Sequence, residues 1–521
     1  MTARQSGLTA LLTNAFHGDP LRLTSGDRNR MVASRQALDG RLATGGEVYG
    51  ISRGFGPLVA YGTDGDAEAQ GIRLIHHLCV GQGAPLGASE TRLMYWLRLV
   101  GMRQGHSAVP VADWTRLAEL YDSGFVPLVP SEGSLSASGD LVPLAHAALA
   151  LAGDGEAWAP DGTVRPAAEA LRSAGSAPVR WTARTALAFV NGSSASLAVA
   201  ILNHQRLGAV ARSLAAVTGR VAALLGCNPE AYDDALQLVR NQKGQWQAAE
   251  WIRDELPAAQ HPADGRPLQE PYSLRCAPQV IGAVLDQLDL QEQVLTAEAA
   301  GVTDNPVTVG QRVLHGGNFH AMPVSFASDM LALCAQQLAF LAERQLALLV
   351  DPRHNGGLTP MLTWTPGPHS GLAGVQIAAS SMVAKARQLA YPSGLTALPT
   401  NMGNQDHVPM ALNGAVVGTE VIRYAQLATA SLALAATQLG HHLAASPAEG
   451  TVWARLHDIS PPLLVDRPLA AEVRRTAATL AAAYNPDPRL VDVLSPAGGD
   501  NRSWGRRAEP TQDEDEGAHH G

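Results

Sequence analysis

Three consecutive residues, Ala137, Ser138 and Gly139, could build an electrophile from their own backbone. If the Gly139 amide nitrogen attacks the Ala137 carbonyl carbon, loss of water closes a five-membered imidazolone ring. Loss of the Ser138 hydroxyl as a second water then leaves an exocyclic methylidene. Glycine suits the attacking position because it has no Cβ to block so close an approach. None of the twenty side chains is a good electrophile, so this tripeptide favours an enzyme.

The residues that follow the tripeptide narrow the interpretation. Taken alone, Ser-Gly-Asp is an ordinary turn before a helix. The whole run Ala-Ser-Gly-Asp-Leu-Val-Pro-Leu-Ala-His, residues 137–146, closely resembles the signature of the histidine and aromatic amino-acid ammonia-lyases and the related 2,3-aminomutases. Further family-like segments occur in order over about residues 45–470. The resemblance implies that Ala137, Ser138 and Gly139 form the prosthetic group 4-methylidene-imidazol-5-one (MIO), without a metal or a diffusible organic cofactor.

Tyr49 lies in a glycine-rich segment, residues 48–56, that resembles the family's Tyr-Gly-x-x-Thr-Gly-Phe-Gly loop. A tyrosine among glycines can simply anchor a loop, but the resemblance implies that Tyr49 is the general base that removes the substrate β-proton. A free phenol has a pKa of about 10, so we expect the site to lower the pKa of Tyr49. The family usually has Thr-Thr or Asn-Thr where this chain has Ser52 and Arg53. Arg53 could stabilise a Tyr49 phenolate or face solvent.

Other segments match motifs that hold the substrate. Arg275 lies in Tyr-Ser-Leu-Arg-Cys-Ala-Pro-Gln, and a guanidinium can clamp an α-carboxylate with two parallel hydrogen bonds. By the same resemblance, Tyr272 faces the MIO and the substrate amine, and Asn191 hydrogen-bonds the prosthetic carbonyl and the substrate. The other pocket positions that the resemblance implies are Asn305, Phe319, Asn401 and Gln405.

Two segments bear on the substrate side chain. His77 and Leu78 resemble the His-Leu pair of tyrosine ammonia-lyases, where phenylalanine-specific relatives have Phe-Leu. An imidazole can pair with a phenol hydroxyl, whereas a phenyl ring would leave that hydroxyl buried without a partner. We expect His77 to face the pocket and His76 to point elsewhere. Gln405 is neutral where histidine ammonia-lyases carry a glutamate, which argues against histidine as substrate. We expect a structural role for His407, or a second polar edge of the pocket.

These features together predict a tyrosine ammonia-lyase that releases trans-p-coumarate and ammonia from L-tyrosine, with L-phenylalanine giving cinnamate as a second substrate. The main alternative is an aromatic 2,3-aminomutase, which uses the same residues to make a β-amino acid. The outcome depends on how long the Tyr49 loop retains the acrylate. A histidine ammonia-lyase and a catalytically silent scaffold are weaker alternatives. The resemblance also implies a homotetramer in which three subunits build each pocket.

The elements that position these residues are mainly helices. Several long segments are apolar around most of their circumference, which is typical of helices buried among others. Such helices predict a central bundle covered partly by other subunits. The predicted fold is therefore mainly α and ammonia-lyase-like, with few short strands. The long predicted helices cover residues 194–225, 279–298 and 322–350.

The chain divides into three predicted parts. Residues 1–200 form an N-terminal lobe with the MIO loop and the Tyr49 loop, and residues 201–495 form an elongated helical bundle. Residues 496–521 are polar and acidic and are predicted to be disordered.

Composition limits the partners and the compartment. The 521 residues have a formal charge of −9, which makes nucleic acid or an anionic membrane an unexpected partner. The four cysteines are isolated and have no metal-ligand spacing, as expected for reduced thiols in a cytoplasmic protein. The first 20 residues do not resemble a signal peptide. The most apolar segment considered as a membrane span, residues 427–444, is interrupted by polar side chains.

Overall fold

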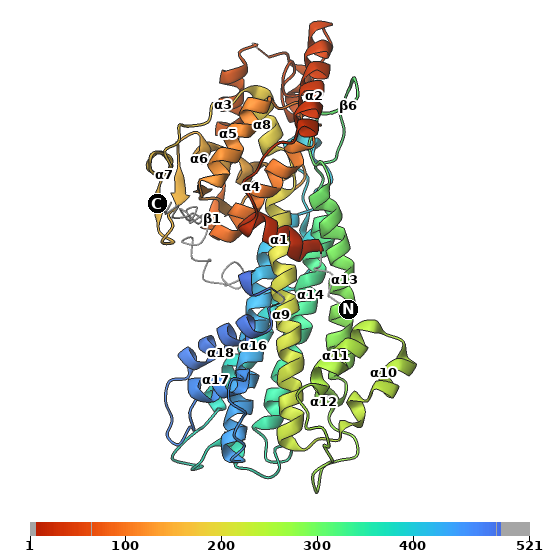
Figure 1. Ribbon diagram of the computed structural model, residues 1–521, viewed down its shortest axis with the longest axis vertical. Helices are drawn as coiled ribbons and strands as arrows, with labels where there is room; N and C mark the ends of the chain where they lie inside the picture. Colours follow the sequence, from red (N-terminus) through yellow and green to blue (C-terminus); the bar gives the residue numbers. More distant parts are fainter. Residues whose placement is uncertain (1–6, 64, 486, 491–521) are drawn as a thin grey trace, which may run out of the picture.

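The computed structural model describes residues 7–63, 65–485 and 487–490. It is an elongated, mainly helical molecule with a lobe at one end and long helices running away from it (Figure 1). This confirms the predicted fold class. The acidic segment predicted for residues 496–521 lies outside the described residues.

The lobe is built from short and medium helices packed around a hydrophobic core that includes Trp114, Trp181 and Phe189. Each of these side chains is almost completely buried. The helices of the lobe are α1 (Gly7–His17), α2 (Ser25–Ala43), α3 (Ala67–Leu78), α4 (Ala88–Arg103), α5 (Val111–Asp122), α6 (Leu141–Leu151), α7 (Ala167–Ser173) and α8 (Ala183–Val190).

The strands are short, and all pair antiparallel with one another. They form the sheets β1-β3, β2-β4-β5 and β6-β7. Their bounds are Gln82–Pro85 for β1, Val126–Pro127 for β2, Pro130–Glu132 for β3, Glu156–Trp158 for β4, Val164–Pro166 for β5, Val307–Val309 for β6 and Arg312–Leu314 for β7. Such small sheets brace loops of the lobe and add little to its core.

Five long helices form the bundle and share a second hydrophobic core. They are α9 (Ser194–Leu225), α13 (Ala277–Ala300), α14 (Met322–Leu349), α15 (Ala373–Leu389) and α16 (Ala411–His442). Smaller helices flank them: α10 (Asp234–Arg240), α11 (Lys243–Arg253), α12 (Tyr272–Arg275), α17 (Val452–Ile459) and α18 (Ala470–Ala483). The 3-10 turns are η1 (Gly56–Ala60), η2 (Pro229–Tyr232), η3 (Pro360–Leu362), η4 (Ser393–Thr396), η5 (Asn401–Gly403) and η6 (Pro488–Leu490).

Helix α9 connects the two cores. Its first part packs into the lobe core as far as Leu202, and its second part packs into the bundle core from Leu207 onward. Between them lies a buried polar layer in which Asn203 donates to the Ala415 carbonyl at 2.8 Å and Arg206 pairs with Glu90 at 2.7 Å. Since α9 runs unbroken through residue 200, the division into two domains there stays a prediction.

The predicted helices over residues 194–225, 279–298 and 322–350 correspond to α9, α13 and α14. Helix α9 ends where Gly226 adopts a left-handed conformation, φ +62°, that favours glycine. Two helical stretches, residues 183–225 and 322–349, are long and apolar enough to cross a membrane, whereas the segment weighed and set aside from the sequence was residues 427–444. Their apolar windows are 100% and 67% buried inside the molecule, as in core helices.

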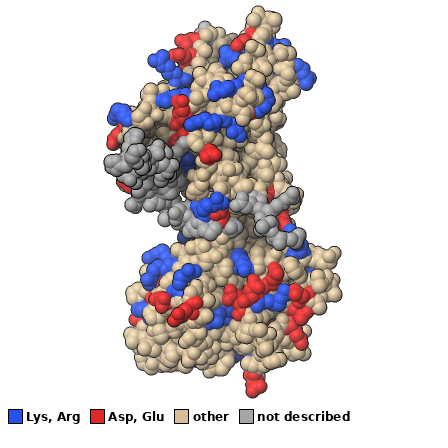
Figure 2. Space-filling model, viewed as in Figure 1, with Lys and Arg blue, Asp and Glu red and all other residues tan. Residues whose placement is uncertain are grey.

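Charged side chains of both signs are interspersed over the lobe and the bundle on the face that Figure 2 shows.

Candidate active site

The Ala137-Ser138-Gly139 segment folds back sharply on itself. The backbones of Ala137 and Gly139 form an isolated bridge across Ser138. Gly139 has a φ of +69°, and a Cβ at this position would lie 2.4–2.5 Å from backbone atoms of Gly192. Glycine is therefore required both by the backbone conformation and by the close approach. The fold thus brings together the two residues whose backbone atoms would close an imidazolone ring.

A buried carboxylate holds this segment in place. Asp140 is completely buried and accepts hydrogen bonds from the hydroxyls of Ser134 at 3.0 Å and Ser136 at 2.7 Å. Its other oxygen accepts from the backbone amide and the hydroxyl of Ser196, at 2.7 and 2.8 Å. Ser196 lies in the first turn of α9, where backbone amides lack helical partners. Burial raises the pKa of Asp140, although the hydrogen bonds from the three serines lower it.

Two side chains from distant parts of the chain contact Ser138. The Asn191 side-chain amide donates to the Ser138 carbonyl oxygen at 2.9 Å, and the Gln405 side-chain amide donates to the Ser138 hydroxyl at 2.9 Å. Asn191 is 3% exposed, and its Oδ1 has no hydrogen-bond partner within residues 7–63, 65–485 and 487–490. A buried acceptor without a donor is costly. This orphaned oxygen, next to the folded-back tripeptide, fits a site that receives a polar group.

A cavity of about 760 Å³ opens beside Ser138. The residues expected from the sequence that line it are Tyr49, His77, Leu78, Ser138, Asn191, Asn401 and Gln405. They come from the Tyr49 loop, α3, the MIO segment, the end of α8 and the loop before α16. One chain therefore brings seven of the predicted positions to a single cavity large enough for an aromatic amino acid.

The Tyr49 phenol lies in this wall with one close donor. The Gly56 amide donates to the Tyr49 hydroxyl oxygen at 2.8 Å. Burial nevertheless raises the pKa of Tyr49 above its ordinary value of 10.0. The shift is opposite to the direction expected from the sequence, because the phenol packs edge-on against Phe55, with ring centroids 5.9 Å apart. Arg53 provides no compensating cation, since its guanidinium pairs with Glu47 and donates to the Ala60 carbonyl at 3.2 Å.

His77 lines the cavity, and His76 is absent from its lining. The Nδ1 atom of His77 lies 3.0 Å from the Arg73 carbonyl oxygen, which can only accept a hydrogen bond. Nδ1 must therefore carry the proton, and in the neutral ring Nε2 keeps its lone pair. A phenol hydroxyl that reached this ring would find an acceptor.

Apart from Ala137 and Gly139, which flank Ser138, four of the predicted site residues do not line this cavity. Tyr272 lines a separate cavity of about 620 Å³ beside the C-terminal half of α14. The guanidinium of Arg275 lies 4.5 Å from the centre of the Tyr272 ring, and its buried Nε has no hydrogen-bond partner in the part of the chain that the structure describes. Asn305 accepts a hydrogen bond from the Gly316 amide at 2.8 Å, and Phe319 is half-buried before α14.

Apart from Leu78, the apolar wall of the cavity was not predicted from the sequence. Phe55, Leu141 and Leu187 line it, and the Phe55 ring lies 6.3 Å from the His77 ring. Phe55 belongs to the same Gly-Phe-Gly run as the Tyr49 loop, so the motif contained a signal for it. Leu141 lies in the run 137–146 that resembles the family signature, whereas Leu187 is an ordinary leucine in helical sequence and carried no such signal.

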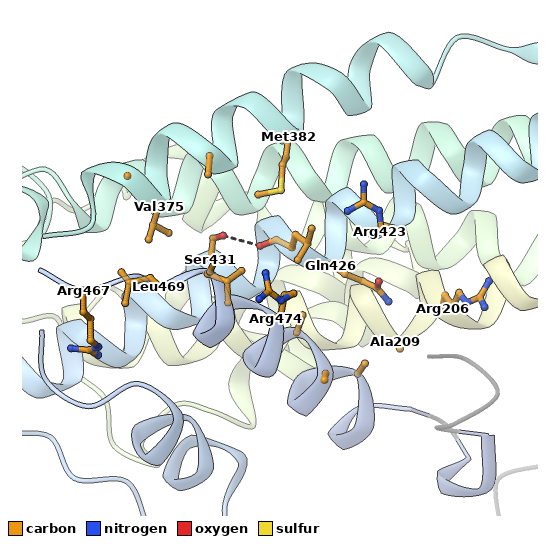
Figure 3. A pocket seen from close by; sticks show the side chains of 18 of the residues that line it. Arg206, Ala209, Val375, Met382, Arg423, Gln426, Ser431, Arg467, Leu469 and Arg474 are labelled. Atoms are coloured by element: carbon orange, nitrogen blue, oxygen red, sulfur yellow. Dashed lines mark hydrogen bonds between the residues drawn. The ribbon is translucent and has the colours of Figure 1, made fainter. Parts of the chain in front are cut away.

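A larger cavity of about 840 Å³ lies between α9, α15, α16 and α18 (Figure 3). Its lining is mostly apolar and includes Val375, Met382 and Leu469, together with Arg423 and Arg474. Ser138 and the other predicted site residues are not among the residues that line it. Volume alone therefore does not identify the active site.

The comparison with protein families decides the class of the chain. Residues 7–458 match the family model described as aromatic amino acid lyase. The chain belongs to this family. It is consequently an enzyme of the ammonia-lyase and aminomutase type, and the family is one that uses MIO.

Individual members of the aromatic amino acid lyase family have several reported substrates. A histidine ammonia-lyase of Sorangium cellulosum is 36% identical over 92% of this chain and 98% of its own length. A histidine ammonia-lyase of Aromatoleum aromaticum is 39% identical over 73% of each chain. Among solved structures, a tyrosine aminomutase from Streptomyces globisporus is 27% identical, with a TM-score of 0.84 over 92% of this chain and 97% of its own. These relatives agree on the family but differ in substrate, so the substrate of this chain has to be inferred from the residues of the cavity.

Proposed function

We propose that this enzyme is a tyrosine ammonia-lyase, converting L-tyrosine to trans-p-coumarate and ammonia, with L-phenylalanine as a second substrate. The observation that carries the proposal is the His77 ring on the wall of the Ser138 cavity. Its Nδ1 is engaged with the Arg73 carbonyl, so Nε2 can accept a hydrogen bond from the substrate phenol. Leu78, the next residue, supplies apolar contact.

The remaining residues of the cavity then have distinct tasks. Formed from Ala137, Ser138 and Gly139, MIO supplies the electrophile that makes the substrate amine a leaving group. Tyr49 accepts the β-proton on its phenolate oxygen, which the Gly56 amide stabilises. Asn191 and Gln405, which contact Ser138 in the structure, orient the reacting part of the substrate. Asn401 closes the same wall.

The carboxylate clamp has to come from another copy of the chain. Tyr272 lines a separate cavity on the bundle and the Arg275 guanidinium lies over its ring, and we assign both residues to the pocket of a neighbouring subunit in a cytoplasmic homotetramer. The buried Arg275 Nε without a partner supports this assignment, because a buried charged donor calls for an acceptor. We also assign Asn305 and Phe319 to this shared pocket.

Two specific observations favour other products. The relatives at 36% and 39% identity are histidine ammonia-lyases, so L-histidine is the alternative to L-tyrosine as the main substrate. The neutral Gln405 beside Ser138 counts against it, since an imidazole substrate has no carboxylate there to pair with. The similar solved structures include a tyrosine aminomutase and a phenylalanine aminomutase, so retention of the amine, giving a β-amino acid, is the second candidate outcome.

The test is product analysis of the purified protein incubated separately with L-tyrosine, L-phenylalanine and L-histidine. We expect p-coumarate to accumulate without early β-tyrosine, as followed by ultraviolet absorbance and chiral chromatography. Early β-tyrosine would establish an aminomutase, and urocanate would establish the histidine enzyme. In parallel, Ser138→Ala should remove the near-ultraviolet absorbance of MIO. A wild-type protein without that absorbance would contradict the proposed chemistry.

A further inference from the structure

Two histidines outside the cavity lining connect the loop that carries Gln405 to the rest of the lobe. The His407 Nδ1 atom lies 3.3 Å from His320 Nε2, which also lies 3.2 Å from the His407 carbonyl oxygen. The ring centroids are 5.3 Å apart. The two residues are 87 positions apart in the sequence, so this contact depends on the tertiary fold.

The hydrogen-bond pattern of the pair has one satisfactory arrangement of protons. A carbonyl oxygen can only accept, so His320 Nε2 must carry a hydrogen to bond the His407 carbonyl. That hydrogen is then shared with His407 Nδ1, which must present its lone pair. The reverse arrangement would place the lone pair of His320 against the carbonyl oxygen. His320 is therefore the donor of a forked hydrogen bond, and His407 is the acceptor at two atoms.

The segment that this bond restrains is otherwise exposed. Residues 401–404 and 406–407 are exposed, and Gln405 is half-buried. Within the described part of residues 401–407, the side chains that hydrogen-bond another segment are Gln405, on Ser138, and His407, on His320. Behind His407 the chain is fixed again, because Met410 donates to the Leu135 carbonyl at 3.0 Å.

His320 itself is attached to the MIO segment. The next residue, Ala321, donates its amide to the Ser136 carbonyl at 3.3 Å, and α14 begins at Met322. The forked bond thus links the Gln405 loop to the same backbone that leads into Ser138. We infer that His320 and His407 are positioning residues that hold the Gln405 side chain against Ser138. The expected effect on catalysis rests on the proposed function, whereas the restraint of the Gln405 loop does not.

The test combines hydrogen–deuterium exchange with steady-state kinetics on the full-length protein. In His320→Ala and in His407→Ala, we expect faster amide exchange over residues 400–408 and a kcat about tenfold lower, since a small displacement of a positioning group is costly. The kcat of the double variant should be no lower than the kcat of either single variant. His320→Gln, which keeps a side-chain N–H at a similar reach, should restore most of the lost kcat.

A matched control is available in another histidine pair. His441 and His457 have ring centroids 4.3 Å apart at the far end of α16, so His441→Ala should leave both exchange over residues 400–408 and kcat unchanged. Melting temperature and MIO absorbance identify any variant that fails to fold or mature. If exchange over residues 400–408 stays at the wild-type rate in both alanine variants, the inference is wrong. A double variant whose kcat loss equals the product of the two single losses would also contradict the inference.

The two proposals fail in different ways. A wild-type protein that is inert toward all three amino acids would contradict the proposed function, while the exchange experiment would still decide whether the histidine pair restrains the Gln405 loop. Faster exchange with unchanged kcat and KM in an active enzyme would overturn the positioning role and leave the proposed function intact.

Discussion

Tyr49 combines an apolar surrounding with a single amide donor, and this combination predicts a pH dependence. Burial raises its pKa above 10.0, so the phenol is neutral at pH 7 and the base form becomes more abundant as pH rises. We expect kcat/KM to increase from pH 7 to pH 9, approaching about tenfold per pH unit if no other group limits the rate.

Tyr49→Phe should lower kcat by about 10²- to 10⁴-fold and remove this rise with pH, as expected for loss of a general base. Tyr61→Phe is the matched control, because Tyr61 lies in the same loop and is 67% exposed. A Tyr49→Phe enzyme that kept the wild-type pH profile would assign the proton transfer to another group.

His77 determines the choice of substrate in our proposal. His77→Phe removes the acceptor for the phenol hydroxyl, so the ratio of kcat/KM for L-tyrosine over L-phenylalanine should fall by roughly 100-fold or more. His76→Phe, one position away and outside the cavity lining, should leave the ratio within about threefold of the wild-type value. Competition assays with both substrates measure the ratio directly.

At the level of elements, the MIO segment depends on the start of α9. Asp140 accepts four hydrogen bonds from three serines, one of which is in the first turn of that helix. Asp140→Ala leaves these buried donors without an acceptor and should lower the free energy of unfolding by about 2–4 kcal/mol. We also expect the variant to lose MIO absorbance, because the loop no longer folds back.

Asp161→Ala is the control for this change. Asp161 is exposed and accepts hydrogen bonds from the nearby Thr163, so its removal should leave the free energy of unfolding nearly unchanged. Denaturation curves and absorbance spectra of the two variants provide the comparison. Equal losses of stability would show that Asp140 does not organise the segment.

The elements also show what sequence can and cannot predict. Helix α9 was predictable because its residues are apolar around most of the helix and a glycine follows its last turn. The orientation of Arg53 was not predictable, since the two alternatives, Tyr49 and solvent, did not include Glu47, with which its guanidinium pairs in the folded loop. The contact between His320 and His407 likewise joins two loops that only the tertiary fold brings together.

At the scale of the whole molecule, the motifs predict which residues act in the site but not where these residues lie relative to one another in one chain. Seven of the predicted positions meet at one cavity, while Tyr272 lines another. Resemblance between motifs carries no information on the distance between them in one subunit. The separation became visible only when the bundle placed α12 beside α14.

Shared pockets predict complementation between inactive variants. Ser138→Ala and Arg275→Ala should each be inactive alone, yet co-expression should regain roughly a quarter of the wild-type activity if the chains assemble at random. Co-expression of Ser138→Ala with Asn191→Ala should regain none, because both residues line the same cavity of one chain. Recovery in the second pair only would contradict the shared-site proposal.

Helix α9 fixes the distance between the MIO segment and the surroundings of Tyr272 within one chain. Ser196 contacts the MIO segment through Asp140, and Thr218 shares Gln345 with the Ser273 carbonyl beside Tyr272. About six helical turns, or roughly 33 Å, separate these two points on α9. If two copies each take the clamp for their own lobe from the other's bundle, the paired chains run antiparallel. Each such pair would then carry its catalytic centres at opposite ends, separated by a fixed span of rigid helix.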